Sequence, residues 1–282
     1  MTWSGWITSR FDPTHKLPQQ LLRGKLDGMK LLDRIVGWIR CATKPIQSLV
    51  SSRTGSNAPM KVERVWDDKS RAEMRDTLRW VVLGELRLAK NDTGDILNIC
   101  REVYLIDECP EAEIEEFVQF AASEIDRITT KIDGEKAAWP NETDCDRLDC
   151  VEQALRERGI LLWQVSPCCD TCTCAELSDR IEVINQRYPG FGDRVRGYAF
   201  FIDQNMPEAL AEDTQLMICL GYGACLPNGS EIPKRRYEKS ALGIAQEVCE
   251  CLRDENFVVE WGGELSRKIC LSLNWQRRTM LE

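Results

Sequence analysis

The hydrophobic pattern of this 282-residue chain changes its period at Trp139-Pro140, and this change constrains the fold more than any other feature. Before it, across residues 67–132, apolar side chains recur at the three- and four-residue spacing that is typical of amphipathic helices. After it, short apolar runs are separated by helical segments and by turn residues. A chain that combines both periods is predicted to fold as an α+β protein.

The part of the chain after Trp139-Pro140 is expected to mix helices with strands. We predict a largely antiparallel sheet covered by helices, with a ferredoxin-like order of elements and a small helical layer before it. The expected helices cover residues 144–158, 174–188 and 237–253. The expected strands cover residues 160–165, 197–203, 216–222, 257–261 and 268–275.

Composition divides the chain into three parts. Residues 1–59 hold nine Lys and Arg against three Asp and Glu, a net charge of +6, and are expected to form a basic, partly disordered leader. Within it, residues 28–41 have the pattern of a basic amphipathic helix, which would suit weak contact with an anionic membrane surface or docking onto the acidic body. Residues 60–140 are predicted to be the helical layer, and residues 141–282 the α+β domain.

The remainder of the chain is strongly acidic. Residues 60–282 hold 28 of the 37 Lys and Arg and 43 of the 46 Asp and Glu, a net charge of −15, which argues against nucleic-acid binding. The longest uncharged apolar run, residues 216–226, has 11 residues, whereas a membrane helix needs about 20. The first residues also lack the apolar segment of an export signal. We therefore expect a cytoplasmic protein without a transmembrane segment, and an acidic surface of this kind would suit a basic protein partner.

Histidine is almost absent, since His15 in the leader is the one histidine of the chain. This excludes Ser-His-Asp and Cys-His catalytic pairs from the body and leaves thiolates, carboxylates or backbone oxygens as metal ligands. The chain has 14 cysteines, and without an export signal a disulfide framework is disfavoured. Most of them are predicted to pack as small hydrophobic side chains, among them Cys100, Cys145 and Cys219.

Four cysteines lie within seven residues, between an expected strand and an expected helix. They are Cys168, Cys169, Cys172 and Cys174. A helix N-terminus favours thiolates, and our first expectation is that these four hold one Zn²⁺ in a structural or regulatory site, with Cys219 or Cys225 available to complete the set. The alternative is thiol-disulfide exchange at Cys169 and Cys172, and a third is that the thiols have no function.

Six ordered motifs resemble a bacterial domain family of unknown function. The motifs are WPNETDCDRLD (139–149), ERGI (157–160), CCDTC (168–172), GYAFF (197–201), LGYGA (220–224), and VEWGG with NWQRR (259–278). Where the family pattern has Gly-His after the third Cys, this chain has Thr173-Cys174, and Ile202 stands where members tend to have His. Exchanging His for Cys replaces one soft metal ligand by another. The resemblance implies the fold and the cysteine cluster, and it implies no activity.

Acidic residues are concentrated before and within the helix expected at 144–158. Thr143 and Asp146 have the spacing of a capping box. A hard-metal or acid-base site could be built from Glu142, Asp144, Asp146 and Asp149, but acids at a helix N-terminus favour its dipole, so they are interpreted as structural, with Arg147 as a partner for one of them. Three function classes stay open: a thiolate metal-binding module, a thiol oxidoreductase or redox sensor, and an interaction module. Of these, the zinc-binding module is favoured, and an enzymatic role is not.

Overall fold

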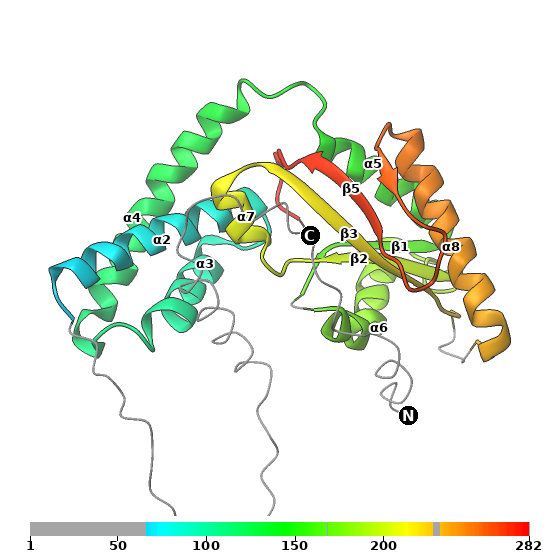
Figure 1. Cartoon of the computed structure of the whole chain (residues 1–282), viewed down its shortest axis with the longest axis horizontal. Coiled ribbons are helices and arrows are strands. Elements are labelled where there is room, and N and C mark those ends of the chain that lie inside the picture. The colour runs from blue at the N-terminus through cyan, green and yellow to red at the C-terminus, as the bar shows by residue number, and fades with distance from the viewer. Residues whose placement is uncertain (1–65, 168, 228–231, 282) are drawn as a thin grey trace, which may run out of the picture. The chain divides into compact units, whose positions relative to one another are not determined.

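The computed structural model describes residues 66–167, 169–227 and 232–281, which belong to one compact unit. Figure 1 follows this part of the chain from its first helix in cyan to its last strand in red. The leader predicted for residues 1–59, with its amphipathic helix at residues 28–41, lies outside the described residues.

The described chain begins with helices alone, as the spacing of apolar residues predicts. They are α2 (Asp68–Leu88), α3 (Thr93–Ile99), the π-helical segment η3 (Cys100–Leu105) and α4 (Glu111–Lys136). Asp67 caps α2 by accepting a hydrogen bond from the Ser70 N–H. The apolar faces of these helices form one buried core, which includes Leu78, Val82, Ile96, Phe117 and Ile125.

After Trp139-Pro140 the chain alternates between helices and strands. Helix α5 (Asp144–Glu157) begins with the predicted capping box: the Asp146 N–H donates to the Thr143 hydroxyl, and the Thr143 N–H donates to the Asp146 carboxylate. Gly159 then turns the chain into the first strand with a φ of +73°, and a Cβ at this position would also meet the Arg194 carbonyl.

The described residues after Gly159 form a five-stranded sheet in the order β1-β2-β3-β5-β4. The strands are β1 (Ile160–Ser166), β2 (Gly197–Ile202), β3 (Gln215–Ala224), β4 (Val259–Glu260) and β5 (Ile269–Asn274). The helices between them are α6 (Asp170–Arg187), α7 (Met206–Glu212) and α8 (Lys234–Asp254). β1 and β2 are parallel because α6 crosses between them, and all other pairs are antiparallel.

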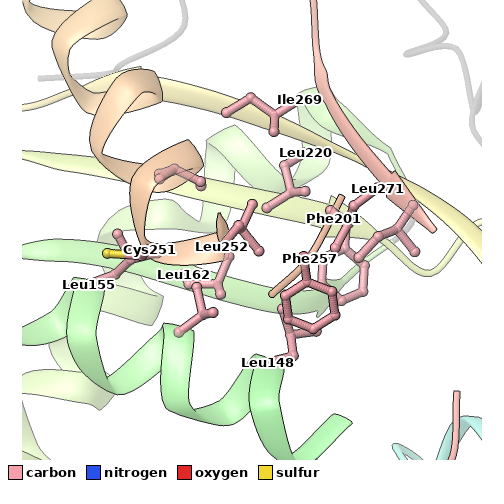
Figure 2. Close-up of a cluster of buried hydrophobic side chains, with 14 of the residues drawn as sticks. Leu148, Leu155, Leu162, Phe201, Leu220, Cys251, Leu252, Phe257, Ile269 and Leu271 are labelled. Atoms are coloured by element: carbon pink, nitrogen blue, oxygen red, sulfur yellow. The ribbon is translucent and has the colours of Figure 1, made fainter. Parts of the chain in front are cut away.

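The two faces of the sheet are covered differently. On one face, α5 and α8 bury a continuous apolar cluster against the strands, with Leu148, Leu162, Leu220, Leu252 and Leu271 among its members (Figure 2). On the other face, α6 packs over β1 and β2, where Leu177 and Ile184 meet Leu161, Tyr198 and Phe200. Over β3 and β5, the strand register places Cys219 and Cys270 on this second face, and both are partly exposed.

The predicted α+β fold and its largely antiparallel sheet are confirmed, whereas the ferredoxin-like order of elements is not. Helix α7 separates β2 from β3 and was not expected, and β5 lies between β3 and β4 in the sheet. None of the helices in the described ranges is both long enough and apolar enough to cross a membrane.

Candidate functional site

The turn that carries the cysteine cluster is held by buried hydroxyl groups. The Ser166 hydroxyl donates to the Phe201 carbonyl at 3.1 Å, and the Thr173 hydroxyl donates to the Ser166 hydroxyl at 2.9 Å. Both hydroxyl side chains are fully buried. These bonds join the end of β1, the neighbouring strand β2 and the first turn of α6, so the loop between β1 and α6 has a fixed starting point.

The backbone is strained just before this turn. Val165 has a φ of +51°, a left-handed conformation that a β-branched residue rarely adopts, at the irregularity in register between Trp163 and Ser166. Such conformations persist only where the surrounding structure enforces them, and they are concentrated at functional sites. The strain therefore supports a functional interpretation of the loop that follows.

Cys169 and Cys172 lie together at the start of α6. Cys169 is the N-cap residue, Cys172 is the third residue of the helix, and their sulfur atoms are 3.5 Å apart, with both side chains half-buried. The first N–H groups of a helix have no acceptor within the helix and give its start a partial positive charge, which stabilises a nearby thiolate. The arrangement is that of a reduced thiol pair, because a disulfide needs a sulfur separation of about 2.05 Å.

Cys174 does not join this pair. It packs on the sheet-facing side of α6, against the apolar cluster that contains Tyr198. Burial, together with the carboxylate of Asp170, raises the pKa of the Cys174 thiol to about 11, so this side chain stays protonated at neutral pH. Cys168 is outside the described residues, and within those residues no group of three or more Cys, His, Asp or Glu side chains could hold a metal ion.

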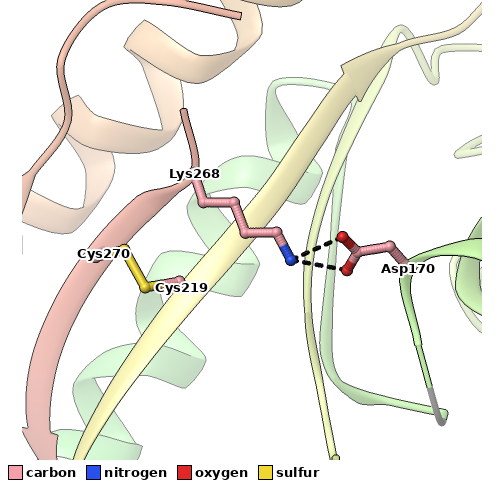
Figure 3. Close-up of a disulfide and its surroundings, with 4 residues drawn as sticks. All are labelled: Asp170, Cys219, Lys268 and Cys270. Atoms are coloured by element: carbon pink, nitrogen blue, oxygen red, sulfur yellow. Dashed lines mark hydrogen bonds and ion pairs between the residues drawn. A yellow bond between two sulfur atoms is a disulfide. The ribbon is translucent and has the colours of Figure 1, made fainter. Parts of the chain in front are cut away.

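A lysine reaches the helix start that carries the thiol pair, and a disulfide lies on the same face of the sheet. Figure 3 shows Lys268, the residue before β5, reaching over β3 to the carboxylate of Asp170, the neighbour of Cys169. The ammonium nitrogen is 2.8 Å from that carboxylate. Close by, Cys219 of β3 and Cys270 of β5 form a disulfide between two residues that face each other in the register.

The disulfide corrects one prediction from the sequence. Cys219 does not pack as a free thiol and is not available as a metal ligand, because the register of β3 and β5 places Cys270 directly opposite it, with their Cα atoms 4.1 Å apart. The prediction for Cys100 and Cys145 is confirmed. Both are buried free thiols, and burial raises the pKa of each to about 12.

Three acids of α5 make contacts within the fold, and most of their partners were not foreseen from the sequence. Arg147 pairs with Asp144 at 2.6 Å, as predicted. Asp146 belongs to the capping box and also pairs with Arg278 at 3.0 Å. The contact of Arg278 attaches the C-terminal segment of the chain to the start of α5.

Arg277 makes a second, deeper contact between the C-terminal segment and α5. Its guanidinium donates to both oxygens of Asp149, at 3.0 and 2.9 Å, and to Gln164 of β1 at 2.7 Å. The arginine side chain is 3% exposed and the Asp149 side chain 46%. The NWQRR motif contains both arginines, yet nothing in its residues indicates which acids they meet.

One comparison with known proteins gives a match. A family model described as "Domain of unknown function (DUF6891)" matches residues 71–279. No curated protein and no solved structure matches the chain.

Proposed function

Because this chain belongs to the DUF6891 family, whose function is unknown, we propose a function from the chemistry of its own residues: thiol-disulfide exchange at Cys169 and Cys172. The observation that carries the proposal is the 3.5 Å separation of the two sulfur atoms at the start of α6. A C-x-x-C pair after a strand and at a helix N-terminus is the arrangement that thiol-disulfide oxidoreductases use. The strained end of β1 and the buried hydroxyl pair beneath the loop would hold the two thiols in this geometry.

The reaction partner would be a disulfide, either in another protein or in a small molecule such as oxidised glutathione. The Cys169 thiolate attacks one sulfur of that disulfide, and the other sulfur leaves as a thiolate and takes up the proton that Cys169 released. Cys172 then loses its proton and attacks the Cys169 sulfur of the mixed disulfide, and the second partner sulfur leaves and takes up that proton. Two electrons pass to the partner, which becomes a pair of thiols, and Cys169 and Cys172 become a disulfide.

A zinc site at Cys168, Cys169, Cys172 and Cys174 is the competing proposal. Structural zinc sites almost always have four ligands, and within the described residues only two thiols of the cluster lie side by side. Cys174 lies on the sheet-facing side of the helix, packed against the cluster that contains Tyr198. Exchange at a pair of thiols needs no third ligand, so the geometry favours it.

Disulfide mapping combined with metal analysis tests the proposal. The full chain is purified without chelator, equilibrated with oxidised glutathione, alkylated and analysed by peptide mass spectrometry. We expect a Cys169–Cys172 disulfide and well under one equivalent of zinc. The variant Cys172→Ser should accumulate glutathione on Cys169, because the resolving thiol is missing, whereas Cys150→Ser, which removes an exposed cysteine outside the pair, should behave as the parent chain.

A different outcome of the same experiment would support the zinc site. One equivalent of zinc that is released by Cys172→Ser, with no Cys169–Cys172 disulfide under oxidising conditions, would replace thiol-disulfide exchange by the metal-binding function.

A further inference from the structure

A cleft of about 610 Å³ lies between the helical layer and the C-terminal segment, on residues that the thiol site does not use. Its walls come from the last turns of α2 and α4, from Trp139, and from residues 275–280. Binding sites for small molecules have volumes of about 300–1,000 Å³. The cleft is therefore large enough for a ligand of ordinary metabolite size.

The lining of the cleft holds more basic than acidic side chains. Four basic side chains line it, against the two acids Asp133 and Glu135. The basic side chains are Arg87, Lys136, Arg277 and Arg278. Lys136 and Arg87 pair with these two acids, at 2.8 and 3.8 Å, whereas Arg277 and Arg278 pair with Asp149 and Asp146, which do not line the cleft. The lining therefore holds two more basic than acidic side chains, and a recess with an excess of one sign of charge concentrates ligands of the opposite sign.

Two of these arginines have donor groups that the described protein does not use. Arg87 donates one Nη1 bond to the Leu210 carbonyl at 2.7 Å, and its Nη2 lies 3.8 Å from the Glu135 carboxylate, too far for a hydrogen bond. Its Nε is buried and has no acceptor within the described residues, and the same is true of the Nε of Arg277. A guanidinium has five N–H donors, so Arg87 in particular has capacity left for a carboxylate or phosphate.

An aromatic surface completes the cleft. Trp139 is half-buried, and the guanidinium of Arg278 stands 5.8 Å from the centre of its ring. Arg277 makes a similar contact with the buried Trp275, at 5.2 Å from the centre of its ring. A partly exposed indole beside a guanidinium group suits a ligand that has both a flat apolar body and a negative charge.

We propose that this cleft is a binding site for a planar organic anion. Arg87 binds its carboxylate or phosphate group, Lys136 and Arg278 add positive charge, and Trp139 contacts its flat apolar part. A carboxylate and a phosphate would both be bound by the guanidinium of Arg87, and titration with one probe of each kind distinguishes them.

Calorimetric titration of the full chain tests this site. The probes are phenyl phosphate, benzoate, inorganic phosphate and the neutral benzyl alcohol. We expect saturable binding of phenyl phosphate or benzoate, at least about tenfold tighter than that of benzyl alcohol or inorganic phosphate, because the ring and the charge both contribute. The stronger of the two aromatic anions identifies the preferred acidic group.

Two lysines of α4 provide a matched pair of variants. Lys136 lines the cleft, whereas Lys131, five residues earlier, does not and makes its own exposed ion pair with Glu135. Lys136→Gln should weaken binding by about threefold or more, and Lys131→Gln by less than about twofold, although each removes one positive charge. Trp139→Leu should weaken the aromatic anions while leaving the weak binding of inorganic phosphate unchanged.

Three results would overturn the proposal. They are no saturable binding of either aromatic anion up to about 10 mM, equal effects of the two lysine variants, and binding of benzyl alcohol as tight as that of the anions. Circular dichroism and melting temperature of each variant show whether it is folded. If Trp139→Leu is not folded, the lysine pair alone decides, because both lysines lie on the surface of α4 and neither change removes buried contacts.

Discussion

The contact of Arg277 with Asp149 predicts an unequal response to removing either partner. Arg277 is 3% exposed and Asp149 is 46% exposed, so the two charges differ in their access to water. If Asp149 is removed, a buried guanidinium keeps Gln164 as its only partner from this network. If Arg277 is removed, the carboxylate can be hydrated where it stands. We therefore expect Asp149→Ala to be the more damaging of the two substitutions.

The magnitudes follow from the burial of each group. Breaking a fully buried ion pair by removing one partner costs about 3–5 kcal/mol, and the half-exposure of Asp149 reduces this, so Asp149→Ala should lower the free energy of unfolding by about 2 kcal/mol. Arg277→Met keeps an apolar side chain of similar length in the same space and should cost about 1 kcal/mol. The double variant should also cost about 1 kcal/mol, which gives a coupling energy of about 2 kcal/mol.

Equilibrium unfolding in urea, followed by circular dichroism at pH 7, measures all four proteins. The slope of the unfolding free energy against urea should be the same in each, so that midpoints report stability. A cost for Arg277→Met that equals or exceeds that of Asp149→Ala would refute the reasoning from burial. Costs that simply add in the double variant would show that the two side chains are not coupled.

Three further predictions concern other parts of the described chain. Gly84→Ala should lower the melting temperature even though alanine favours helices by about 1 kcal/mol, because the added Cβ meets the Pro207 carbonyl and overpacking costs about 1–3 kcal/mol; an unchanged melting temperature would contradict this. A hydrogen bond from Arg71 lowers the pKa of Glu113 to about 2. Glu113 therefore contributes stability that is present above pH about 4.3 and lost as pH falls through 2, so Glu113→Gln should lower the melting temperature at neutral pH and have little effect at pH 2. An effect of Glu113→Gln on the melting temperature that is the same at both pH values would contradict this. Cys270→Ser removes a cross-link between residues 51 apart and should lower the free energy of unfolding by about 4 kcal/mol. Reductant should lower the free energy of unfolding of the parent chain by the same amount and leave that of the variant unchanged.

Much of the fold was predictable because local signals agree with tertiary structure. The capping box at Thr143 and Asp146 is formed as predicted, and each of the five expected strands overlaps a strand of the structure. One exception has a local cause. Val103 lies three residues after the buried Cys100, a spacing that an α-helix places on one face, yet it is 46% exposed, because η3 is π-helical and its wider turn shifts the phase of the side chains that follow.

Other features depend on contacts that a sequence does not display. Helix α7 has seven residues, too few to be stable by itself, and it exists through close packing of Pro207 against Gly84 of α2. The disulfide depends on the register of two strands that are distant in the sequence. The separation of Cys174 from the thiol pair, by contrast, follows from helical geometry, because residues two positions apart do not share a face, whereas Cys169 and Cys172 are three apart.

A measured reduction potential tests most directly whether Cys169 and Cys172 form a redox pair. The full chain is equilibrated in buffers of defined thiol and disulfide content, quenched by alkylation, and the state of each cysteine is read by mass spectrometry. We predict that Cys169 and Cys172 change together in one two-electron transition, between about −120 and −270 mV, while Cys174 stays reduced throughout. Two thiols that remain alkylated across this whole range, or that are oxidised independently of each other, would contradict the account.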